Sequence, residues 1–252
     1  MKKFFLAAVP IIFIMAASCA SGSKVRGKHL YDCSGKLLEG IEKYNKKRYS
    51  SAQFTFSEII SKCPGHSAYD TTLYYLGKSW LAMKKPDEAK LEFEHIVQMF
   101  PSSVYNEEAR YLLGYSSYLA SSPWYLDQTS TKEAQRRLKD FLELNPQGPF
   151  ADSARLYIAK CDNKMAEKEF NAARFYEKTN HYEAAIVYFK NIIDEFPESP
   201  FAPQAKLSLA GDLIVLSRSS EAIAVLDELL EQSKDEAVLK KATALRQKAV
   251  KK

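Results

Sequence analysis

Cysteine and histidine residues have the most distinctive chemistry in this 252-residue chain. Cys33 precedes one expected helix and Cys63 ends the next, so an antiparallel helix pair would bring them together. In an oxidising compartment this arrangement predicts a Cys33–Cys63 disulfide, with Cys161 as a small buried apolar residue. The alternative is a zinc site of His29, Cys33, Cys63 and His66, which have H-x3-C and C-x2-H spacing.

No pattern of catalytic residues accompanies these side chains. The chain has no G-x-S-x-G, H-E-x-x-H or glycine-rich phosphate loop, and His95 and His181 are isolated. Charged residues make up 27% of the chain, and both signs are interleaved to a net charge of +5, which argues against nucleic-acid binding. We therefore predict a protein that is not an enzyme, uses no cofactor and acts by binding other proteins.

The N-terminus reads as a secretion signal. Lys2 and Lys3 precede a 14-residue apolar run, Phe4–Ala17, which is shorter than the roughly 20 residues of a membrane span. We predict that residues 1–18 are a signal peptide. Residues 19–35 are polar and small, as expected of a flexible tether.

The sequence Met-Ala-Ala-Ser-Cys at residues 15–19 resembles the lipobox of bacterial lipoproteins. The resemblance implies that Cys19 becomes the new N-terminus and carries a diacylglyceryl group and an N-acyl chain, which together give stable anchoring. Ala20 stands where lipoproteins of the inner membrane often have Asp. The implied location is the periplasmic face of the outer membrane.

After residue 35 the sequence contains a repeated pattern of proline, small and large apolar residues. Four prolines mark it, and each is preceded by an alanine twelve residues earlier and by a large apolar residue eight residues earlier. The prolines are Pro64, Pro101, Pro146 and Pro197; the preceding residues are Ala52, Ala89, Ala134 and Ala185, then Phe56, Phe93, Leu138 and Phe189. Small residues follow thirteen positions after the prolines, at Gly77, Gly114, Ala159 and Ala210. A fifth copy keeps Ala222, Leu226 and Leu230.

Such spacings place apolar residues on one stripe of each helix, and proline ends the helix. A single helix pair cannot bury its stripe, so the pairs must stack. We predict an all-α, right-handed superhelical solenoid of about five helix pairs, resembling tetratricopeptide (TPR) repeats. Two places interrupt the repeat: residues Ser121–Ser130 read as an inserted loop, and Arg155–Lys178, which lacks Pro and Gly, reads as one extended helix.

The segment Asn163–Pro197 looks like the fourth repeat of the BamD family, lipoproteins of the outer-membrane β-barrel assembly machinery. The inserted loop also resembles that family, whereas Val187-Tyr188 departs from its frequent Asn-Arg. The resemblance implies binding to the POTRA domains of the barrel-forming subunit BamA, to other assembly lipoproteins and to unfolded outer-membrane proteins. The alternatives are a TPR regulator of cell-wall synthesis or of the Tol system, and a peptidoglycan-contacting protein.

The expected binding surface is the concave face, which the first helix of each pair lines. We assign residues 36–148 to three client-binding repeats and residues 149–252 to two partner-docking repeats. The predicted client groove contains four tyrosines and a lysine: Tyr74, Lys78, Tyr111, Tyr115 and Tyr118. Aromatic rings with hydroxyl groups suit extended chains, although these rings could instead pack between helices.

The predicted partner-docking residues combine aromatic and basic side chains: Phe170, Arg174, Lys178 and Tyr188. This mixture suits an interface with a polar rim, and the alternative is a solvated helix face. The basic run Lys240–Lys252 is helical in pattern, and its charge either favours the helix C-terminus or contacts a partner or membrane.

Overall fold

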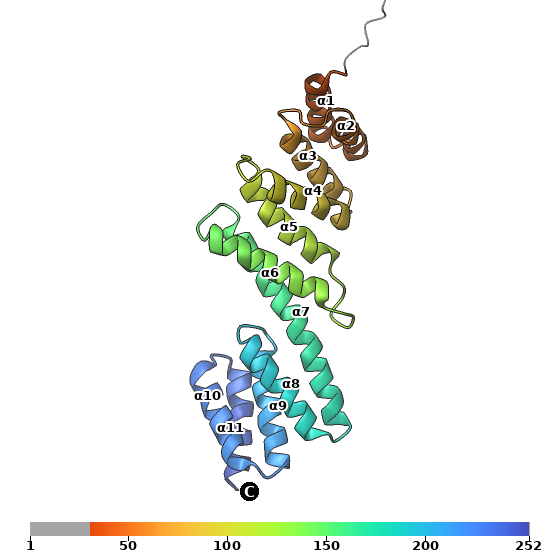
Figure 1. Ribbon diagram of the computed structural model, residues 1–252. Helices are drawn as coiled ribbons and strands as arrows, with labels where there is room; N and C mark the ends of the chain where they lie inside the picture. The colour runs from red at the N-terminus through yellow and green to blue at the C-terminus, as the bar shows by residue number, and fades with distance from the viewer. Residues whose placement is uncertain (1–30, 252) are drawn as a thin grey trace, which may run out of the picture. The chain divides into compact units, whose positions relative to one another are not determined.

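The structure is a computed structural model that describes residues 31–251. Within that range, helices are the only regular secondary structure (Figure 1). Eleven helices follow one another in this described part of the chain. They are α1 (Cys33–Asn45), α2 (Tyr49–Lys62), α3 (Tyr69–Ala82), α4 (Pro86–Met99), α5 (Asn106–Ala120), α6 (Thr129–Leu144), α7 (Ala151–Lys178), α8 (Tyr182–Glu195), α9 (Ala202–Val215), α10 (Ser219–Gln232) and α11 (Glu236–Val250).

Consecutive helices form five pairs, α1/α2 to α9/α10, and each pair packs against the next. The last helix, α11, packs on α9 and α10. This succession is the predicted TPR-type solenoid. Four of the five pairs share a three-residue turn whose middle residue has a φ of 58–61°: Lys47, Lys84, Asn180 and Ser217. The fifth pair, α5/α6, contains the predicted inserted loop at residues 121–128.

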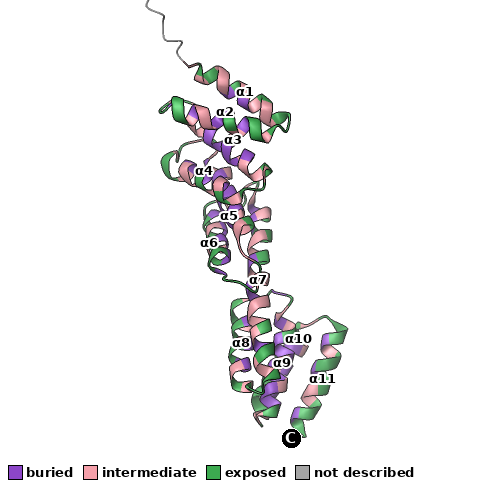
Figure 2. Ribbon diagram, turned by 90° about the vertical axis from the view of Figure 1, so that its right-hand side faces the viewer, coloured by how far each residue is buried: buried purple, intermediate pink, exposed green. Residues whose placement is uncertain are grey.

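The repeated sequence positions are the core. All five alanine positions and all five large apolar positions are fully buried, with 0% of their surface exposed (Figure 2). These residues are Ala52, Ala89, Ala134, Ala185, Ala222, Phe56, Phe93, Leu138, Phe189 and Leu226. The sequence pattern therefore identified the packing face of the second helix in each pair.

Small residues on the first helices allow the close crossing within each pair. A Cβ on Gly77 would lie 2.8 Å from the Phe93 ring, and one on Gly114 would lie 2.8 Å from the Leu138 side chain. Ala159 was expected at the corresponding position of the fourth repeat, but it is exposed. Ala173 is fully buried there instead, since it shares a core cluster with Phe189.

The helix α7 has 28 residues, which confirms the prediction of one extended helix. Its extra length explains the shift from Ala159 to Ala173, because 14 residues are about four helical turns. Ala154 of α7 joins the core of the preceding repeats. Ala166 and Ala173 belong to the core of the following repeats. The single helix α7 thus connects two separate cores.

The structure joins Cys33 at the start of α1 to Cys63 at the end of α2 in a disulfide, with 6.2 Å between the Cα atoms. The bond removes the thiolates that the alternative zinc site needs. His66 instead lies 3.2 Å from the Ser34 hydroxyl, and His29 lies outside the described residues. Cys161 is free and fully buried, and burial raises the pKa of its thiol to about 12.

Cys19 and the predicted signal peptide also lie outside the described residues. Among residues 31–251, no helix combines the length and apolar character needed to cross a bilayer. The same residues contain no cluster of three or more potential metal ligands of the His, Cys, Asp and Glu types.

Replacement of Gly77 by Ala should lower the free energy of unfolding by about 1–3 kcal/mol, because the new methyl group overlaps the Phe93 ring. Gly211 of α9 is the matched control, since a Cβ there meets nothing within 4 Å. Gly211→Ala should raise the free energy of unfolding by roughly 0.5–1 kcal/mol through helix propensity. Urea unfolding of both variants measures the difference, and equal effects would contradict the proposed helix crossing.

Loss of the disulfide should destabilise the first helix pair. The bond closes a loop with a sequence separation of 30, and such cross-links typically contribute about 2–4 kcal/mol. The double variant Cys33→Ser, Cys63→Ser should therefore lose hydrogen-exchange protection in α1 and α2. Dithiothreitol should reproduce the loss in the wild type and leave the variant unchanged; a variant that responds to dithiothreitol would contradict this assignment.

Candidate functional site

Two of the predicted groove tyrosines are part of the core. Tyr74 and Tyr111 are only 5% and 8% exposed. The Tyr74 ring stacks on Tyr105 with 4.2 Å between centroids, and the Tyr111 ring stacks on Phe150 at 5.0 Å. These two rings fix the first helices to one another and present little surface to a ligand.

Lys78 is already neutralised within the fold. Its ammonium group donates a hydrogen bond to the Tyr74 hydroxyl at 2.9 Å and lies 3.6 Å from the Glu108 carboxylate. Burial, followed by the contact with Glu108, raises the pKa of Tyr74 far above its usual value. Lys78 therefore stabilises the α3/α5 contact and is a weak candidate for binding a ligand carboxylate.

The accessible aromatic surface lies further along the chain, between α5 and α7. Tyr115 and Tyr118 of α5 both contact Tyr157 of α7, with ring centroids 4.7 and 5.1 Å apart. The Lys160 ammonium lies 4.5 Å from the centroid of the Tyr157 ring, and the Lys164 ammonium lies 4.9 Å from that of Tyr118. We call these five residues the tyrosine–lysine surface.

The two lysines of the tyrosine–lysine surface lack an anionic partner. Neither Lys160 nor Lys164 forms an ion pair with any described residue, and Lys164 donates only to the Ser121 hydroxyl at 2.6 Å. Burial lowers the pKa of Lys164, since desolvation disfavours its charged form. A ligand carboxylate would relieve this cost, so the surface suits an extended chain with aromatic and acidic groups.

Sequence reasoning included Tyr115 and Tyr118 but missed Tyr157, Lys160 and Lys164. Their spacing of three and seven residues places them on one face of α7, which was a signal available in the sequence. The extended helix obscured this spacing. The repeat pattern assigned residues 155–178 to the fourth repeat alone, although the N-terminal part of this helix packs on the third.

The predicted partner-docking residues divide into core and surface. Phe170 packs against Phe189 and Phe201, with ring centroids 5.8 and 5.5 Å apart, so it is structural. Arg174 and Lys178 are exposed. The half-buried ring of Tyr188 on α8 stacks on a tyrosine of α7, Tyr176, at 5.4 Å.

A buried carboxyl group lies beside Arg174. Asp212 of α9 is 4% exposed, and its Oδ2 atom has no hydrogen-bond partner. Burial, and then contact with Glu177 of α7, raises the pKa of Asp212 to about 7, whereas Arg174 opposes the shift. Arg174 forms an ion pair with Glu177, so three charged groups connect the first helices of the last two pairs.

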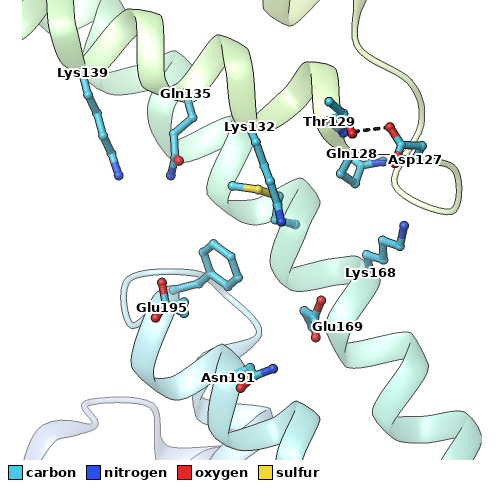
Figure 3. Close-up of a pocket in the computed structure, with 12 residues that line it drawn as sticks. Asp127, Gln128, Thr129, Lys132, Gln135, Lys139, Lys168, Glu169, Asn191 and Glu195 are labelled. Atoms are coloured by element: carbon cyan, nitrogen blue, oxygen red, sulfur yellow. Dashed lines mark hydrogen bonds between the residues drawn. The ribbon is translucent and has the colours of Figure 1, made fainter.

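A pocket of about 670 Å³ lies where the two interruptions of the repeat meet (Figure 3). We call it the inter-repeat pocket. Figure 3 shows Lys132, Gln135 and Lys139 pointing into it from α6, opposite Asn191 and Glu195 of α8.

The inserted loop closes one end of the inter-repeat pocket, because Lys168 of α7 donates to the Leu126 carbonyl at 2.8 Å. The Gln128 amide holds the loop by donating to the carbonyls of Pro123 and Leu126, at 2.7 and 3.1 Å. Met165 and Phe196 provide apolar surface, while the α6 and α8 walls carry opposite charges. Such a pocket suits a partner segment with both charges and an apolar anchor.

The fold defines a class, a TPR-type helical repeat protein, and the tyrosine–lysine surface and the inter-repeat pocket are its candidate binding sites. The model of the YfiO family, described as an outer membrane lipoprotein, matches residues 37–211. The chain belongs to this family of outer membrane lipoproteins. The match includes both the inserted loop and the extended helix.

Curated relatives agree with the family. The chain is 26% identical over 184 residues to an outer membrane protein assembly factor BamD of Rickettsia prowazekii, covering 73% of each chain. It is 27% identical over 199 residues to a putative BamD of Aquifex aeolicus, covering 77% of this chain and 63% of the relative. The solved TPR domain of P58(IPK) aligns with a TM-score of 0.44 and 14% identity, covering 86% of this chain and 55% of that one.

Asp212→Asn should stabilise the protein most at high pH. The pKa of Asp212 near 7 in the folded state exceeds the unfolded value of about 3.9. Wild-type stability therefore falls as pH rises from about 4 to about 7 and stays lowered above that range. The amide avoids this loss, so the variant should gain on the order of 3 kcal/mol at about pH 8 and almost nothing at about pH 4.

Urea unfolding across that pH range tests this expectation, with exposed Asp194→Asn as the control that leaves Asp212 untouched. A gain for Asp212→Asn that does not change with pH would show that Asp212 is not the titrating group.

Proposed function

We propose that the chain is a lipid-anchored scaffold of the machinery that assembles β-barrel proteins in the outer membrane. It holds unfolded outer-membrane proteins and docks the barrel-forming subunit and other assembly lipoproteins. The observation that carries the proposal is the family match over residues 37–211, together with an assembly-factor relative that matches over 73% of each chain. The anchor is the acylated Cys19, and the folded repeats lie on the periplasmic face.

The tyrosine–lysine surface is the proposed site for the unfolded client. Its rings offer large rigid contact area at low entropic cost, and Lys160 and Lys164 supply unpaired positive charge. In this proposal Tyr74, Lys78 and Tyr111 of the predicted groove are structural residues and do not contact the client, because those side chains already pair with each other or with the core.

The C-terminal repeats are the proposed dock for the barrel-forming subunit. Arg174, Lys178 and Tyr188 remain accessible there, and the inter-repeat pocket adds oppositely charged walls. The protein acts through binding alone in this proposal, with no catalytic residues and no cofactor.

A tag-based purification from detergent-solubilised outer membranes tests the proposal directly. The tagged chain should recover the barrel-forming subunit in near-equal amount. Recovery of cell-wall synthases or Tol proteins without the barrel-forming subunit would favour a TPR envelope regulator instead.

Replacement of Lys164 by Gln together with Tyr157 by Ala should weaken binding of a client-derived peptide by about tenfold or more, because one charge and one ring are lost. Fluorescence anisotropy with a labelled C-terminal peptide of an outer-membrane protein measures the affinity. Lys132→Gln, in the inter-repeat pocket, is the control and should bind the peptide as the wild type does. Equal affinity of all three proteins would place the client elsewhere.

A further inference from the structure

The net positive charge of the chain is concentrated at its C-terminal end. Residues 236–252 contain six basic residues and one acidic residue, a net charge of +5, which equals the net charge of all 252 residues. Residues 1–235 together therefore carry no net charge. This asymmetry is confined to α11 and the two residues that follow it.

A groove runs beside this basic helix. A cavity of about 460 Å³ lies between α9 and α11, and Lys241 and Lys248 of α11 form one side of it. Ala244 and Leu245 of α11 provide its accessible apolar surface beside the buried Leu207 of α9, and Ser208 adds a neutral polar group. No carboxylate lines this cavity, whereas the inter-repeat pocket contains acidic residues from three of its segments.

Two other basic residues nearby are already paired within the fold, whereas Lys251, which lines an adjacent cavity with Lys248, is exposed and forms no ion pair with any described residue. Arg246 of α11 forms an ion pair with Asp227, and Lys206 of α9 is 2.8 Å from Glu228. Lys241 and Lys248 form no ion pair with any described residue, and both are exposed. The groove therefore presents two uncompensated positive charges around an apolar centre.

We propose that the groove between α9 and α11 binds an acidic amphipathic segment of a partner protein. Lys241 and Lys248 are seven residues apart, which is two turns or about 10 Å along the helix. A partner helix with carboxylates two turns apart matches this spacing, and an apolar side chain between them would contact Ala244 and Leu245. A flat lipid surface satisfies the charges but does not reach the apolar surface between two helices.

The place of α11 in the fold supports this proposal. Among the described residues, α11 packs on α9 and α10, and much of the rest of its surface is exposed. Asp235 caps its N-terminus by accepting hydrogen bonds from the backbone N–H groups of Ala237 and Val238, at 2.8 and 3.3 Å. The helix is thus fixed in place without a covering partner. The proposal stands independently of the β-barrel assembly role.

The test uses the full chain in detergent and a labelled alanine-based helical peptide. The peptide carries two glutamates two turns apart and two leucines between them. We expect saturable binding that weakens with added salt, since exposed ion pairs are screened. The double variant Lys241→Glu, Lys248→Glu should bind at least about tenfold more weakly, whereas Lys240→Glu, exposed on the same helix outside the cavity, should retain most of the affinity.

Three results would overturn the proposal. The first is equal binding of a peptide in which lysines replace the glutamates. The second is a Lys240→Glu variant that loses as much affinity as the double variant, which would indicate attraction to the whole basic helix. The third is lysine-dependent binding to phosphatidylglycerol vesicles without binding to the acidic peptide, which would make the groove a membrane contact. Circular dichroism establishes that each variant is folded.

Discussion

The close crossing of the two helices in each pair is the constraint on which this structure depends. A glycine or alanine on the first helix meets a large apolar residue on the second, and at Gly77 there is no room even for a methyl group beside Phe93. Each first helix from α3 to α9 also packs on the second helix of the preceding pair, so only the surface outside both contacts is free to vary. On that surface Lys160 is exposed, whereas Tyr115, Tyr118 and Tyr157 of the tyrosine–lysine surface are partly buried against the core, so replacement of a tyrosine also affects the stack.

The two interruptions of the repeat matter because they occur together. Four additional turns in α7 separate the core that contains Ala154 from the core that contains Ala173. The inserted loop fills part of the resulting space, and Lys168 fastens it to α7. A pocket with charged walls lies between α6 and α8, the second helices on either side of α7. The two irregularities thus together form the inter-repeat pocket.

The sequence predicted the helix pairs, the core positions, the inserted loop and the extended helix, because each depends on local spacing. It misplaced Ala159 as a crossing residue, since spacing alone does not say which turns of a long helix face the next pair. It also treated Tyr74 and Lys78 as accessible. Periodicity identifies the face of a helix but not the depth to which a neighbouring helix covers it, and Tyr105 and Glu108 provide that cover here.

The disulfide lies where the N-terminal segment joins the folded repeats. In the proposed protein anchored through Cys19, a mechanical pull on the N-terminus would enter the fold at α1, the first described helix. Because Cys33 is bonded to Cys63, this load passes directly to the far end of α2 and is shared by both helices of the pair. In the proposed anchored protein, the disulfide therefore makes α1 and α2 resist such a pull together.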